Sequence, residues 1–126
     1  MAKKRILVDD DEQGMLDLLE SLLERNGYEV STCDSGLTAW SAIIDNKPDL
    51  LILDVMLPGT DGVSLQKKIS ENEETKHMPV IVISALEPTR TMFRKYHQVK
   101  RFIMKPFKHE EITKAVEKAI DAGPDS

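Results

Sequence analysis

Short apolar runs alternate along this chain with longer segments of helical periodicity. The apolar runs at 6–8, 50–53 and 80–83 each end at a polar residue. Runs of this length are typical of strands that are covered on both faces. Apolar side chains also recur at helical spacing over about 15–23 and 63–72. The other predicted elements are strands at 28–33 and 99–104 and helices at 37–44, 87–96 and 112–120.

Turn residues separate these elements. Asn26-Gly27 ends the first predicted helix, Pro48 follows the second, and Gly123-Pro124 ends the last. A strand followed by a helix, five times over, predicts one α/β domain with a parallel sheet and helices on both of its faces. We place this domain at 1–122 and a polar tail at 123–126.

The composition is that of an ordinary soluble domain. Of 126 residues, 40% are hydrophobic and 31% charged, and no apolar run is long enough to span a membrane. The basic start MAKKRILV meets acids after three apolar residues, so we do not expect a signal peptide. The single cysteine, Cys33, excludes an internal disulfide, favours a cytoplasmic location and is interpreted as a core or strand residue.

Charge is unevenly distributed. The net charge of −5 argues against nucleic-acid binding by the surface as a whole, and we expect no direct nucleic-acid or membrane binding. Yet seven Lys or Arg and no acid lie between Pro88 and His109. One hypothesis is that the stretch 90–101 docks an acidic partner surface; the alternative is a solvated helix face.

Polar residues follow the predicted strands at one edge of the sheet. Neighbouring carboxylates repel by on the order of 4 kcal/mol at ~4 Å and an effective dielectric of ~20, so the acid run needs a compensating partner. Oxygen-rich clusters suit Mg²⁺, and an aspartate can attack phosphorus if a cation and a hydroxyl stabilise the developing charge. The edge therefore suits phosphoryl transfer onto an aspartate. Its residues are Asp9, Asp10, Asp11, Asp54, Ser84 and Lys105.

Four segments, ILVDDDE, LLILDVMLPGTDG, VIVISA and FIMKPF, resemble the bacterial response-regulator receiver domain, the CheY-like family. The resemblance covers essentially the whole chain. It implies a doubly wound, flavodoxin-like (βα)5 fold with strand order 2-1-3-4-5. It also implies a phosphorylation-activated switch of two-component signalling that catalyses its own aspartyl phosphorylation and dephosphorylation.

The resemblance assigns roles to the acids. Asp54 resembles the phosphoacceptor, Asp11 a direct Mg²⁺ ligand and Asp10 a ligand acting through water, with the backbone carbonyl of Met56 completing the protein ligands. Without the resemblance, Asp54 could be a strand-end turn residue. The acid run could equally be a helix N-cap, and both readings could hold for different acids.

The resemblance also implies a phosphoryl-binding set. Lys105 would pair with Asp54 and then with the phosphoryl group, and the Lys105–Pro106 bond is a candidate cis peptide. Ser84 and Ala85 would contact the phosphoryl group. The alternative for Ser84 is a helix N-cap, and for Lys105 a lysine ahead of a helix-starting proline.

Two further roles concern switching and lifetime. Phe102 matches the aromatic switch residue that turns inward as the hydroxyl of Ser84 moves; ordinary strand packing is its alternative. Met56 and Leu86 occupy positions that tune water access in the family, and both are apolar. Slow autodephosphorylation is therefore expected.

The chain departs from the family pattern at two places. Asp9 stands where an apolar residue is usual, and either adds charge near the site or faces away as the strand frays. Residues 97–101 replace a Gly-Ala pair, so we expect an unusual fourth helix and exit loop. Pro58 and Gly62 are interpreted as loop-shaping residues.

The implied partner is a histidine kinase or phosphotransfer protein, with output through the face of the fourth helix, fifth strand and fifth helix. The chain is expected to be a stand-alone regulator or part of a longer protein, and a monomer or a phosphorylation-linked dimer. One rival is a phosphorylation-independent binding module. The other, a Mg²⁺-dependent phosphohydrolase, is disfavoured because no second aspartate stands two residues after Asp54.

Overall fold

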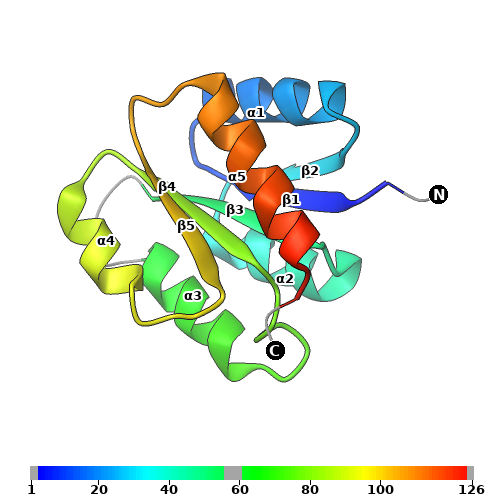
Figure 1. Cartoon of the computed structure of the whole chain (residues 1–126). Helices are drawn as coiled ribbons and strands as arrows, with labels where there is room; N and C mark the ends of the chain where they lie inside the picture. Colours follow the sequence, from blue (N-terminus) through cyan, green and yellow to red (C-terminus); the bar gives the residue numbers. More distant parts are fainter. Residues whose placement is uncertain (1–2, 56–60, 125–126) are drawn as a thin grey trace.

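The computed structural model describes residues 3–55 and 61–124. This part of the chain forms a parallel five-stranded sheet in the order β2-β1-β3-β4-β5, which confirms the predicted doubly wound fold (Figure 1). The strands are β1 (Arg5–Asp9), β2 (Glu29–Cys33), β3 (Leu50–Val55), β4 (Val80–Ser84) and β5 (Val99–Met104).

Five helices cover the two faces of the sheet. They are α1 (Gln13–Arg25), α2 (Gly36–Asn46), α3 (Asp61–Glu71), α4 (Glu87–Phe93) and α5 (His109–Ala122). Helices α1 and α5 pack on one face, and α2, α3 and α4 pack on the other (Figure 1). Among the described residues, no helix combines the length and apolar character needed to cross a bilayer.

Alternation along the strands divides the core between these faces. In β1, Ile6 and Val8 join the cluster under α1 and α5, whereas Leu7 joins the cluster under the other three helices. All five residues of β4 are buried, as expected for a central parallel strand. The two apolar layers hold the sheet rigid, and this fixes the positions of the strand ends.

The strand register brings the predicted site residues to one edge. Asp9 lies opposite Leu53 of β3, and Val55 lies opposite Ser84 of β4. Asp54 and Ser84 are therefore near the carboxyl ends of neighbouring strands. This edge is where ligands bind in open parallel sheets.

Two boundaries differ from the sequence predictions. Helix α4 ends at Phe93 rather than near residue 96, because the Tyr96 amide donates to the Phe93 carbonyl (3.1 Å) in a tight turn. Gly62 lies inside α3 rather than in a loop. A Cβ at Gly62 would lie 2.9 Å from Val55 Cγ2, so glycine allows α3 to approach the end of β3.

The atypical 97–101 segment is anchored by a buried glutamine. Gln98 Nε2 donates to the carbonyls of Thr75 (3.0 Å) and Met78 (2.7 Å), and Gln66 Nε2 donates to Gln98 Oε1 (3.1 Å). A register irregularity between β4 and β5 follows at Val80–Ile81. The hydrogen bonds of Gln98 thus hold the segment that leads into β5, where the sequence analysis expected an unusual exit loop.

Candidate functional site

Asp10 and Asp54 form the buried centre of the edge. Asp10 follows β1 directly and is only 1% exposed, and its Oδ1 accepts the Glu12 amide (3.0 Å). The Asp10 amide donates to the Cys33 carbonyl (3.1 Å), which extends the β1–β2 pairing by one residue. Glu12, the N-cap of α1, makes no side-chain capping bond. The buried Asp10 is thus used to hold the turn into α1, while its other oxygen stays available.

Lys105 supplies the positive charge at this centre. Its Nζ lies 2.9 Å from Asp54 Oδ2, and the Asp54 side chain is fully buried. The Lys105 amide donates to the Ser84 carbonyl (2.9 Å), and the Lys105–Pro106 bond is cis, as predicted. The end of β5 is thereby held against the end of β4. The ammonium is directed at the acid that sequence analysis singled out.

Burial dominates the acid–base properties of the two carboxyls. Burial, together with a hydrogen bond to Asp54, raises the pKa of Asp10 to about 7. Burial also raises the pKa of Asp54, while Lys105 and the bond from Asp10 act in the opposite direction. Because Lys105 favours the ionised form of Asp54, the shared proton belongs on Asp10 and the negative charge on Asp54. An ionised aspartate is the form that can act as a nucleophile.

Asp9 is held inside the sheet by Cys33, so the expectation that it could fray away is wrong. It is the last residue of β1, is 7% exposed, and lies opposite Cys33 in β2. The Cys33 thiol is 3.7 Å from Asp9 Oδ1 and 3.6 Å from the Val8 carbonyl. Burial raises the pKa of Asp9 to about 6 and that of Cys33 to about 12. Cys33 therefore remains a protonated donor toward Asp9, which adds a third buried carboxyl to this edge.

Ser84 has a hydrogen-bonding partner that sequence reasoning missed. Its Oγ donates to Thr89 Oγ1 (3.2 Å) and accepts the amide of Leu86 (3.1 Å). Both hydroxyl residues are fully buried. Leu86, not Ser84, is the N-cap residue of α4. Periodicity did not identify Thr89, because a threonine in the first turn of a helix is usually exposed.

The structure describes three of the remaining predicted site residues, Phe102, Ala85 and Asp11. Phe102 is half-buried against the cluster under α4, and the guanidinium of Arg90 lies 4.9 Å from its ring centroid. Ala85 and Asp11 are exposed. Met56, like Pro58, falls outside the described residues, so the predicted backbone ligand is not placed.

The carboxylates fit a hard cation. Apart from each other and Lys105, the buried oxygens Asp10 Oδ2 and both Oδ atoms of Asp54 receive no hydrogen bond from the described residues. Unsatisfied buried oxygens are costly, and Mg²⁺ prefers such ligands. Within 3–55 and 61–124, however, no three acidic, histidine or cysteine side chains form a ready-made metal cluster. Asp11 would therefore have to turn inward to serve as a ligand.

Comparison with known proteins identifies the family. The model of the response regulator receiver domain matches residues 6–117. The chain belongs to this family. The receiver domain described here is 43% identical to response regulator PleD from Caulobacter vibrioides over 83 residues, which are 66% of this chain and 18% of PleD. It is 36% identical to the polar-differentiation response regulator DivK from Brucella ovis over 85 residues, 68% of each chain.

A solved structure extends the likeness to the whole receiver domain. The receiver domain of sensor histidine kinase PA1611 from Pseudomonas aeruginosa superimposes with a TM-score of 0.84 at 25% identity. It covers 95% of this chain and 99% of that one, and it has a magnesium ion coordinated in its active site cleft. Because the match spans 18% of PleD, the receiver domain corresponds to only one part of that longer relative.

Proposed function

We propose that this receiver domain is a switch that accepts a phosphoryl group on Asp54 from a histidine kinase or phosphotransfer protein. The observation that carries the proposal is the buried Asp54 carboxylate paired at 2.9 Å with Lys105 and adjoining Asp10. A buried ion pair of this kind adds little to stability by itself. Its position at the ligand-binding edge of a receiver fold favours a chemical role.

The reaction is a displacement at phosphorus. An Asp54 oxygen attacks the phosphorus of phosphohistidine, the P–N bond breaks, and the imidazole leaves with the electron pair and takes up a proton. Lys105 then pairs with a phosphoryl oxygen, and the Ser84 hydroxyl donates to another. In the reverse half of the cycle, water attacks phosphorus, inorganic phosphate leaves, and the Asp54 carboxylate is restored. Leu86 is apolar and half-buried, and we expect it to limit water access and so to make this hydrolysis slow.

Asp10, Asp11 and Asp54 would hold Mg²⁺, with the Met56 carbonyl as a further ligand. The ion would neutralise charge that develops on the phosphoryl oxygens. The buried oxygens of Asp10 and Asp54, whose partners among the described residues are each other and Lys105, favour this assignment. Asp10 must lose its proton to act in the site, even through water. Because its pKa is raised to about 7, metal binding should strengthen from pH 6 to pH 8.

The deciding experiment is intact-mass measurement after incubation with acetyl phosphate, with and without Mg²⁺. Wild type should gain one phosphoryl group only with Mg²⁺, and Asp54→Asn should gain none. Asp49→Asn, an exposed aspartate ahead of β3, is the matched control and should behave as wild type. A wild type that is never modified would overturn the switch and leave a phosphorylation-independent binding module as the better description.

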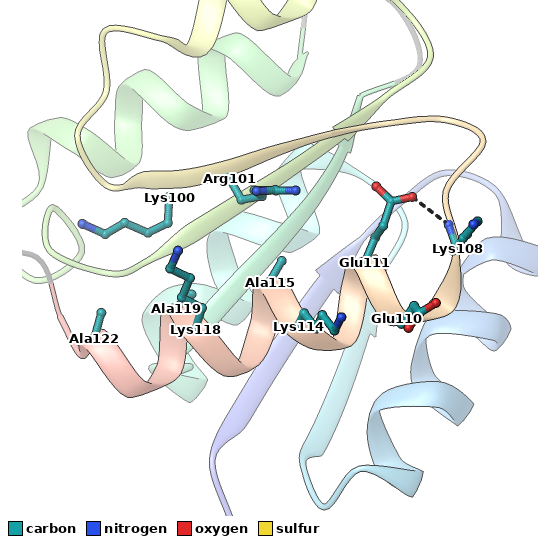
Figure 2. Close-up of a pocket in the computed structure, with 10 residues that line it drawn as sticks. All are labelled: Lys100, Arg101, Lys108, Glu110, Glu111, Lys114, Ala115, Lys118, Ala119 and Ala122. Atoms are coloured by element: carbon teal, nitrogen blue, oxygen red, sulfur yellow. Dashed lines mark hydrogen bonds between the residues drawn. The ribbon is translucent and has the colours of Figure 1, made fainter.

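We further propose that output leaves through the face formed by α4, β5 and α5. A groove of about 650 Å³ lies between β5 and α5 (Figure 2). Five basic and two acidic side chains line it, on a chain whose net charge is −5. Ala115, Ala119 and Ala122 form the α5 side of the groove. We call these residues, with Lys100, Arg101, Lys108, Glu110, Glu111, Lys114 and Lys118, the β5–α5 groove.

Charges on α5 are sorted between its two sides. Lys114 and Lys118, one turn apart, line the groove. Glu117 and Asp121 instead interact with Tyr28: burial is the main cause of the raised pKa of Tyr28, and the two carboxylates raise it further. The carboxylate of Glu111 is used to accept the Lys108 amide at 3.0 Å (Figure 2). The groove is therefore basic on an acidic protein. An acidic protein segment is the partner whose charge it complements.

A further inference from the structure

Both hydrogen bonds of the Ser84 hydroxyl are made with residues at the start of α4. It has one proton, which it donates to Thr89 Oγ1, and it accepts the Leu86 amide. Both bonds turn the oxygen toward the start of α4. A hydroxyl cannot donate to two acceptors at full strength, so Ser84 must leave Thr89 before it donates to a phosphoryl oxygen on Asp54.

Breaking the hydrogen bond between Ser84 and Thr89 costs free energy because of where Thr89 lies. Thr89 is fully buried and lies in the first turn of α4, where its amide donates to the Leu86 carbonyl (3.1 Å). When Ser84 departs, the Thr89 oxygen loses this donor in an interior position, and buried polar groups without partners are unfavourable. The start of α4 must then move for Thr89 to find another partner.

We propose that Thr89 is a positioning residue that holds Ser84 in the unphosphorylated conformation and thereby couples phosphorylation of Asp54 to movement of α4. This inference rests on the proposed function of Asp54 and adds a residue to it. Thr89 acts through Ser84 and does not itself contact the phosphoryl group. It biases the equilibrium between the two conformations toward the unphosphorylated one.

The contact on the outer side of α4 is consistent with this coupling. Arg90, the next residue, lies over the Phe102 ring at 4.9 Å and also pairs with Glu87 at 3.2 Å. Two successive residues of one short helix thus contact both positions, Ser84 and Phe102, that were assigned to switching. Movement of α4 would alter both contacts together.

Phosphorylation rates of Thr89 variants test the proposal. Thr89→Val keeps the shape of the side chain and removes its acceptor, so the acetyl phosphate reaction should accelerate by about three- to tenfold, the equivalent of one lost hydrogen bond. Thr89→Ser should restore the wild-type rate. Thr91→Val, an exposed position on the same helix, should leave it unchanged. Thr89→Ala serves as a second acceptor-free variant if Thr89→Val does not fold.

A spectroscopic measurement separates positioning from a general structural effect. In unphosphorylated Thr89→Val, the Leu86 amide NMR signal should move toward its position in phosphorylated wild type, and Thr89→Ser should return it. An unchanged or slower rate in a folded acceptor-free variant would overturn the proposal and leave the proposed function intact. If wild type itself gains no phosphoryl group, the proposed function fails and this inference fails with it.

Discussion

The Lys105 ammonium lies 2.9 Å from the Asp54 carboxylate, and the Asp54 side chain has no solvent exposure. This pair brings together the ends of β3 and β5, which are separated in the sheet by β4. It also places a positive charge beside an edge that carries three buried carboxyls, those of Asp9, Asp10 and Asp54. Its removal should therefore affect both stability and chemistry.

We predict that Lys105→Met lowers the free energy of unfolding at pH 8 by about 3 kcal/mol, because a buried charge loses its partner. Adding Asp54→Asn to this variant should recover most of the loss, since the uncompensated charge is then absent. Urea unfolding of the wild type, both single variants and the double variant forms the necessary cycle. Equal losses of unfolding free energy in Lys105→Met and in the double variant would contradict the predicted cost of leaving the Asp54 charge without its partner.

Asp9 makes stability depend on pH in a defined direction. Its pKa is raised from 3.8 to about 6, so the folded state holds the proton more tightly than the unfolded state. This contribution is fully present below pH 4 and is lost as pH rises to about 6. Asp9→Asn should thus be more stable than wild type at pH 8 by on the order of 2 kcal/mol, after allowing for screening, and equal to it near pH 4.

Chemical denaturation of Asp9→Asn and wild type across pH 4–8 checks this sign. The difference between the two proteins isolates Asp9 from the other titrating groups. Asp17→Asn, which removes an exposed carboxylate on α1, is the matched control. A difference that grows toward acid pH would be incompatible with a carboxyl held protonated by burial.

Two glycines in helices should respond oppositely to alanine. At Gly62 the new Cβ would lie 2.9 Å from Val55 Cγ2, so Gly62→Ala should destabilise the protein by about 1 to 3 kcal/mol. A Cβ added at Gly14 would meet no atom within 4 Å apart from its chain neighbours and the helix's own backbone, so Gly14→Ala should stabilise α1 by about 0.5 to 1 kcal/mol. Thermal unfolding of both variants measures the contrast. Stabilisation by Gly62→Ala would mean that α3 can shift away from β3.

The β5–α5 groove should discriminate by charge. Lys114→Glu with Lys118→Glu should weaken binding of a synthetic acidic peptide, rich in glutamate and alanine, by about tenfold at low salt. Lys3→Glu with Lys67→Glu makes the same charge change at exposed lysines outside the groove and should alter binding less than about twofold. Fluorescence anisotropy at two salt concentrations provides the measurement. Equal weakening by both pairs, or tighter binding of a single-stranded oligonucleotide, would reject an acidic protein segment as the specific partner.

Much of the site could be predicted because topology carries it. Once strands and helices alternate, the residues that follow parallel strands must meet at one edge, and Asp10, Asp54, Ser84 and Lys105 do so. The cis bond before Pro106 came from family resemblance and is present. What the sequence could not supply are contacts that depend on exact register. The Cys33 thiol reaches Asp9 only because these residues are opposite each other in β1 and β2.

Polar residues in the interior were the hardest to anticipate. Thr89 and Gln98 are both buried and hydrogen-bonded to partners at sequence separations of 5 and 20 or more. Nothing in hydrophobic periodicity distinguishes them from exposed threonine or glutamine. Helix ends were similarly uncertain, because the Phe93–Tyr96 turn that closes α4 is a local hydrogen-bonding choice rather than a pattern of apolar residues.

Strand β5 is held at both of its ends by backbone hydrogen bonds to β4. The Val80 amide binds the Gln98 carbonyl (2.8 Å) before the strand, and the Lys105 amide binds the Ser84 carbonyl (2.9 Å) after it. Lys100 and Arg101 lie between these anchors and are exposed. The outward residues of β5 are therefore structurally separate from the backbone contacts that place Lys105 beside Asp54, so they can diverge during evolution, or be exchanged in a designed regulator, without disturbing that pair.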